Sequence, residues 1–101
     1  MKKILLLCAA GMSTSMVVKK MKEAAEKKNI EAEILALSSD QFEENLDKYD
    51  IFLLGPQIGY QQADLQKKAA TVGKSVEVIN AMDYGMMKGE KILVETLAKL
   101  G

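Results

Sequence analysis

The chain has 101 residues, of which 49% are hydrophobic, a size that fits one small domain with one core. Fourteen basic residues balance fourteen acidic residues, so no net positive field exists to attract nucleic acid or an anionic membrane. One cysteine and no histidine exclude an internal disulfide and leave no Cys/His cluster for zinc, copper or an iron–sulfur centre. We therefore expect a single domain over residues 1–101, with no metal and no cofactor.

The N-terminal segment predicts a buried strand followed by an amphipathic helix. Residues 4–7 are uniformly apolar, as in a parallel strand covered on both faces. This apolar run is too short to span a membrane and soon gives way to a charged segment, so we do not interpret it as a signal peptide. Apolar residues then recur at helical spacing from Val17 to Ala25, which predicts a helix ending near Asn29.

Residues 31–49 predict a second strand and a brief helix. Residues 31–37 alternate at first and then become apolar, which suits a strand nearer the sheet edge. Asp40 followed three residues later by Glu43 resembles a capping box, so a short helix should begin there. Its apolar stripe consists of Phe42, Leu46 and Tyr49.

The C-terminal half predicts two more pairs of strand and helix. Residues 51–54 form an apolar strand that ends at Gly55 and Pro56, because proline cannot donate to a sheet ladder. The following helix should end at Gly73, a residue suited to a left-handed cap. Residues 76–79 predict the fourth strand and residues 89–100 the last helix. The expected inward residues are Ala63, Leu65, Ala69, Ala70 and Val72 in the first of these helices, and Ile92, Leu93, Val94, Leu97 and Leu100 in the second.

Strand and helix thus alternate four times, which favours a parallel sheet between helices, because each crossover is right-handed and covers a face. We expect an α/β fold: a three-layer α/β/α sandwich of the flavodoxin-like type, with a four-stranded parallel sheet in the order 2-1-3-4. Ligands of such sheets bind outside the carboxyl ends of the strands, where the strand order reverses. Cys8 lies at that end of the first strand.

The segment from Cys8 to Ser15 is the main candidate site. Its small residues allow backbone N–H groups to turn inward, and the following helix adds its positive end. This arrangement suits a phosphoryl dianion and favours the thiolate of Cys8 as a nucleophile. The expected phosphate-binding residues are Ala9, Ala10, Gly11, Met12, Ser13, Thr14 and Ser15. The alternative is a buried cysteine that acts only as a small hydrophobe.

Two further loops, residues 55–60 and 80–85, should reach the same edge of the sheet. The candidate partner or rim contacts on them are Pro56, Gln57, Tyr60, Asp83 and Tyr84. Turn formation, helix capping and aromatic packing explain such residues equally well. The methionines after Met1 could form an adaptable docking surface, but we expect most of them, apart from Met12, to fill gaps in the core.

Residues 3–15, with the sequence KILLLCAAGMSTS, resemble the start of the lactose/cellobiose/chitobiose class of enzyme IIB of the bacterial sugar phosphotransferase system. Residues 50–57, Val78-Ile79 and Tyr84-Gly85 extend the resemblance over the chain. It implies that Cys8 takes phosphate from a phosphohistidine of enzyme IIA. Cys8 would pass it to a sugar bound by the membrane enzyme IIC, such as cellobiose, chitobiose or lactose. We expect a cytoplasmic monomer that meets the inner face of the membrane only through enzyme IIC.

Two other functions stay open at this point. Low-molecular-weight tyrosine phosphatases also carry a Cys-x5-Arg-[Ser/Thr] loop after the first strand of a similar sheet. In this chain Thr14 occupies the arginine position, and fast hydrolysis is disfavoured because the arginine fork is what best matches phosphoryl oxygens. A non-catalytic interaction domain with a packed Cys8 is the other alternative. Nucleotide binding has no support, since neither common glycine-rich phosphate motif occurs.

Overall fold

The computed structural model describes residues 2–8 and 12–100, and of residues 12–14 only the backbone. Its centre is a parallel sheet of four strands in the order β2-β1-β3-β4. The strands are β1 (Lys2–Cys8), β2 (Ala32–Ser38), β3 (Ile51–Leu54) and β4 (Ser75–Val78). The expected fold class and strand order are confirmed.

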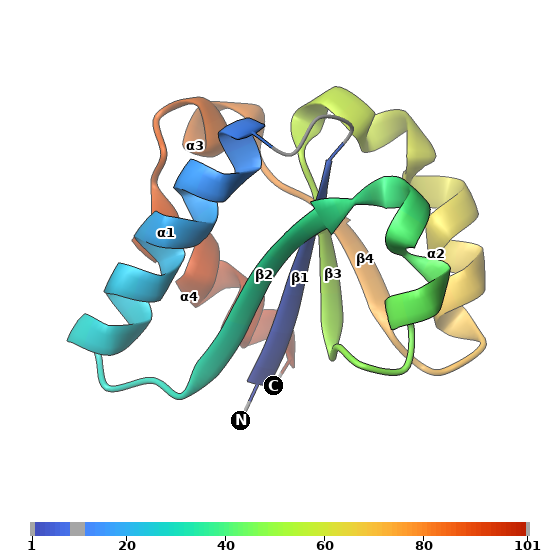
Figure 1. Cartoon of the computed structure of the whole chain (residues 1–101), viewed down its shortest axis with the longest axis horizontal. Coiled ribbons are helices and arrows are strands. Elements are labelled where there is room, and N and C mark those ends of the chain that lie inside the picture. Colours follow the sequence, from blue (N-terminus) through green and yellow to red (C-terminus); the bar gives the residue numbers. More distant parts are fainter. Residues whose placement is uncertain (1, 9–11, 101) are drawn as a thin grey trace.

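Helices cover both faces of this sheet (Figure 1). The α-helices are α1 (Met12–Lys27), α2 (Gln62–Ala70), α3 (Ala81–Gly85) and α4 (Gly89–Leu100). Three 3₁₀ segments complete the connections: η1 (Ser39–Gln41), η2 (Glu43–Asn45) and η3 (Pro56–Gln61). Helices α1 and α4 pack on one face, while α2 and the 3₁₀ segments lie over the other (Figure 1).

The uniformly apolar run of β1 supplies both cores. Successive strand residues point to opposite faces, so Ile4 and Leu6 enter the core under α1 and α4, and Leu5 and Leu7 enter the core on the α2 side. All four are completely buried. A central strand buried on both faces has no position for a polar side chain, which explains the absence of alternation.

The short helix expected after Asp40 is present as 3₁₀ turns. Instead of an α-helix, the segment forms the two 3₁₀ turns η1 and η2, and the cap at Ser38 makes no side-chain hydrogen bond. The 3₁₀ geometry is compatible with tertiary packing, because the turns place Phe42 in the core, with its ring centroid 4.9 Å from that of Phe52. The inward positions of Phe42 and Tyr49 are confirmed.

Several expected inward residues are exposed. Ala63, Ala70 and Val72 face solvent, and the buried residues of α2 are Leu65 and Ala69. Val94 of α4 is also exposed, because Ile92 and Leu93 already point inward. Thr96 is buried instead, with its hydroxyl donating to the carbonyl of Ile92 at 2.7 Å. The left-handed conformation expected at Gly73 is confirmed, with φ of 71°, but α2 itself ends earlier, at Ala70.

Among the residues that the structure describes, no helix is both long enough and apolar enough to cross a membrane.

Candidate functional site

Cys8 is the last residue of the central strand β1 and is 5% exposed. It pairs with Ser38 at the end of β2. On the other side, the amide of Gly55 donates to the carbonyl of Leu7 at 3.0 Å, so the end of β3 lies directly beside it. The carboxyl ends of these strands meet at one edge of the sheet (Figure 1).

Helix α1 begins at this same edge, four residues after Cys8 (Figure 1). The first N–H groups of a helix lack intrahelical partners, and the helix dipole places positive charge there. Met12, Ser13 and Thr14 belong to this first turn, and Ser15 of the same turn is exposed. Ala9, Ala10 and Gly11 lie outside the described residues, so their role in phosphate binding stays a prediction.

Two of the predicted rim residues, Gln57 and Tyr84, lie next to Gly55, the residue that follows β3. A Cβ atom on Gly55 would lie 2.8 Å from Oε1 of Gln57 and 3.6 Å from Cε2 of Tyr84. Tyr84, which is buried, therefore packs from α3 against the end of β3. Pro56 is half-buried, whereas Tyr60 is 80% exposed and its hydroxyl accepts a hydrogen bond from Gln61.

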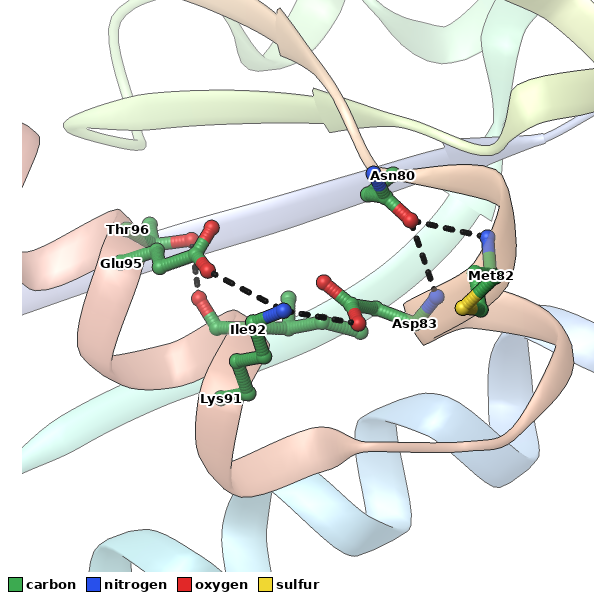
Figure 2. A network of polar contacts seen from close by, with 7 residues as sticks. All are labelled: Asn80, Met82, Asp83, Lys91, Ile92, Glu95 and Thr96. Atoms are coloured by element: carbon green, nitrogen blue, oxygen red, sulfur yellow. Dashed lines mark hydrogen bonds and ion pairs between the residues drawn. The ribbon is translucent and has the colours of Figure 1, made fainter.

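The segment after β4 forms a short helix, α3, where the sequence predicted only a loop. Oδ1 of Asn80 caps this helix by accepting from the amides of Met82 and Asp83, at 2.9 and 3.2 Å (Figure 2). The Asp83 side chain is only 5% exposed, and Nζ of Lys91 in α4 lies 3.2 Å from its Oδ1 (Figure 2). Because a buried carboxylate needs such a partner, this contact fastens α3 to α4.

The structure therefore separates the predicted rim residues into two kinds. Asp83 and Tyr84 are buried and hold the local structure, which favours the capping and packing alternatives for them. Gln57 and Tyr60 are exposed at the edge of the sheet and are accessible to a partner. Of the residues that the sequence missed, Asn80 carries a usable signal, since asparagine three residues before an aspartate is a common helix start. No sequence signal identifies Lys91, because its partner Asp83 lies on a different helix.

The expectation that most methionines fill the core is wrong. Met21 is completely buried, but four others are exposed, by 44% at Met16, 68% at Met82, 63% at Met86 and 41% at Met87. Three of these lie on α3 and the turn that follows it. Within the described part of the chain, no three acidic, cysteine or histidine side chains gather as a metal site would require.

Comparison with known proteins agrees with this geometry. Residues 3–95 match the family model described as "PTS system, Lactose/Cellobiose specific IIB subunit". The oligo-beta-mannoside-specific EIIB component of Bacillus subtilis (strain 168) is 47% identical over 98 residues, covering 97% of this chain and 95% of that protein.

Two solved structures are similar over nearly the whole chain. The cellobiose-specific phosphotransferase IIB component from Borrelia burgdorferi has 40% identity and a TM-score of 0.80, covering 96% of this chain and 89% of that one. The lactose-specific IIB component domain from Streptococcus pneumoniae has a TM-score of 0.88, with coverage of 96% and 95%. At 19% identity the latter similarity concerns the fold alone. Taken together with the family match, these similarities show that the chain belongs to the lactose/cellobiose-specific IIB subunits of the sugar phosphotransferase system.

Proposed function

We propose that this IIB subunit carries a phosphoryl group on Cys8, accepting it from a phosphohistidine of enzyme IIA and delivering it to a sugar bound by enzyme IIC. The observation that carries the proposal is the position of Cys8 at the end of β1, on the edge of the sheet where α1 begins. Residues 9–15 would hold the phosphoryl oxygens through backbone N–H groups and hydroxyls. The sugar is a β-linked disaccharide or a related sugar, as the specificities named for the relatives suggest.

The relay consists of two displacements at phosphorus. In the first, the thiolate of Cys8 forms an S–P bond while the P–N bond of phosphohistidine breaks, and the imidazole leaves with the electron pair. In the second, a sugar hydroxyl forms an O–P bond, the S–P bond breaks, and the hydroxyl proton passes to a base in the acceptor. Such loose transition states require mainly in-line placement and charge stabilisation.

The test is intact-mass analysis after incubation with phosphoenolpyruvate, the general phosphotransferase proteins and a matched enzyme IIA. We expect one phosphate adduct on the wild-type chain and none on Cys8→Ser, because the serine hydroxyl is a far weaker nucleophile than a thiolate. Thermal unfolding of both proteins controls for folding, since Cys8 is buried. Failure of the wild-type chain to gain an adduct from a phosphorylated enzyme IIA would exclude the relay.

A further inference from the structure

The two outer strands of the sheet, β2 and β4, differ in how their free edges are covered (Figure 1). Side chains of α2 bond the edge of β4: Gln66 accepts from the amide of Val76 at 2.8 Å, and Gln62 donates to the carbonyl of Val76 at 2.9 Å. Within residues 2–8 and 12–100, no side chain makes a comparable hydrogen bond to the backbone of β2. The edge of β2 is therefore the less protected of the two.

Alternate residues of β2 direct their backbone groups away from the sheet. The amide of Lys2 donates to the carbonyl of Glu31 at 3.4 Å, at the start of the parallel pairing between β1 and β2. In a parallel ladder the N–H and C=O groups of one residue point to the same side, and those of the next residue point to the other side. Ala32, Ile34 and Ala36 therefore direct their backbone groups outward. An edge of this kind is a template for pairing with another strand.

The charges beside this edge complement themselves. A groove between α1 and β2 is lined by four exposed charged residues of α1: Lys19, Lys22, Glu23 and Glu26. When two copies of α1 lie antiparallel about a two-fold axis between residues 22 and 23, Lys19 of each copy faces Glu26 of the other, and Lys22 faces Glu23. Nζ of Lys20 lies 3.8 Å from Oε1 of Glu23, but such an exposed pair within one helix is weak and leaves Glu23 available.

Leu35 lies at the matching position on β2. Its side chain is 40% exposed and lines the same groove as the four charged residues of α1. A two-fold axis at Leu35 places this residue opposite Leu35 of a second copy, and it pairs the outward backbone groups of Ile34 with those of Ala36 in that copy. Facing residues of such a pair bring their side chains close together, so the exposed leucine becomes buried.

We infer that the edge of β2, with the adjacent face of α1, is a self-association surface at which two copies of this chain join their sheets through antiparallel β2 strands. A two-fold interface needs one self-complementary surface, and both the charges of α1 and the backbone of β2 meet this requirement. Few residues take part, so the dimer is weak, and the dilute chain is the monomer that the sequence predicts. The inference is independent of the proposed function, because antiparallel pairing places the two Cys8 residues at opposite ends of the joined sheet.

The experiment measures the dissociation constant of the dimer by sedimentation velocity of the full chain, from about 5 µM to 1 mM. We expect a Kd on the order of 100 µM for the wild type. The all-acidic variant, Lys19→Glu with Lys22→Glu, and the all-basic variant, Glu23→Lys with Glu26→Lys, each oppose like charges across the axis. Each alone should raise Kd at least about tenfold. An equal mixture of the two opposes unlike charges at every contact, so its Kd should return to within about threefold of the wild-type value.

Two controls separate this surface from effects of net charge. Lys67→Glu with Lys88→Glu has the same net charge as the all-acidic variant, but its exposed substitutions lie on α2 and in the turn before α4. It should dimerise like the wild type. Glu44→Lys with Asp64→Lys has the net charge of the all-basic variant, and its mixture with the all-acidic variant should not associate, because its added lysines lie away from β2. Thermal unfolding of each variant controls for folding.

Hydrogen exchange tests the pairing of the strands themselves. The outward amides of Ile34 and Ala36 should exchange more slowly in concentrated than in dilute wild-type protein, because they become hydrogen-bonded in the dimer. The amide of Val76 should not change, because Gln66 already bonds it within one copy.

Three results would overturn the inference. A wild-type chain that stays monomeric at about 1 mM would exclude a second copy and leave the edge only to a different protein. A mixture of the all-acidic and all-basic variants that associates no better than either alone would exclude the two-fold pairing of α1. Dimers in which the amides of Ile34 and Ala36 exchange at the same rate as in the monomer would place the interface elsewhere.

Discussion

Gly89 brings the start of α4 against the backbone of α1. A Cβ atom at this position would lie 2.5 Å from both the carbonyl carbon and the Cβ of Lys20, and 2.6 Å from the amide nitrogen of Met21. Real Cβ atoms do not come this close to other heavy atoms. Most of the atoms in the way belong to the backbone of α1, which cannot move locally without distorting the helix. The absence of a side chain at Gly89 therefore allows α4 and α1 to pack at this distance.

We expect Gly89→Ala to lower the free energy of unfolding by about 1–3 kcal/mol, the usual cost of overpacking. Gly85→Ala is the matched control, because an added Cβ at Gly85 meets nothing within 4 Å. Urea unfolding of both variants measures the difference. If the two alanine variants unfold at the same urea concentration, the close contact between α1 and α4 does not limit packing.

Sequence patterns located Cys8 correctly at the end of the central strand, because strand ends follow from apolar runs. They did not reveal the role of Gly89, which the sequence shows only as the first residue of a helix. A steric contact between two helices depends on their crossing geometry, and periodicity within one helix contains no such information.

At the scale of elements, the outer edge of β4 is protected by two glutamines of α2. Gln66 accepts from the amide of Val76 at 2.8 Å through Oε1 and donates to the carbonyl of Lys74 at 3.1 Å. Gln62 donates to the carbonyl of Val76 at 2.9 Å. These side chains replace the hydrogen bonds that a neighbouring strand would make, and such edges otherwise invite pairing with another chain.

Gln66→Met should lower the free energy of unfolding by about 1–3 kcal/mol, since the amide of the fully buried Val76 would lose its partner. The protection of the Val76 amide against hydrogen exchange should fall in parallel. Gln61→Met is the control, because among the residues that the structure describes the Gln61 side chain bonds only the exposed hydroxyl of Tyr60. Unchanged protection of Val76 would mean that water replaces the glutamine without cost.

The elements themselves were predictable to differing degrees. The strand at residues 51–54 and the helix at 89–100 agree with the structure residue for residue, because each has a strong apolar pattern. The 3₁₀ geometry of the turns after β2 and the short helix α3 were not predicted, since the geometry of short segments depends on the residues against which they pack. Three exposed methionines lie on α3 and the turn after it, so their exposure could not be predicted from the sequence.

At the scale of the whole molecule, one parallel sheet separates two cores, and stability depends on both. Tyr49, on the connection from η2 to β3, is buried in the core on the α2 side. Burial raises the pKa of the Tyr49 phenol above its ordinary value, and the nearby carboxylate of Glu33 raises it further. An unfolded tyrosine has a pKa of about 10, so the native state holds this proton more tightly than the unfolded state does.

The sign of the pH dependence follows from this difference. The contribution of Tyr49 to stability is complete below about pH 10 and is lost as the pH rises through the higher pKa of the folded state. In urea unfolding between about pH 8 and 11, the free energy of unfolding should fall more steeply for the wild-type chain than for Tyr49→Phe, which has no phenol at position 49 to ionise. Tyr60→Phe should follow the wild type, because the Tyr60 side chain is 80% exposed. Parallel curves for wild type and Tyr49→Phe would show that the Tyr49 phenol ionises equally in the folded and unfolded states.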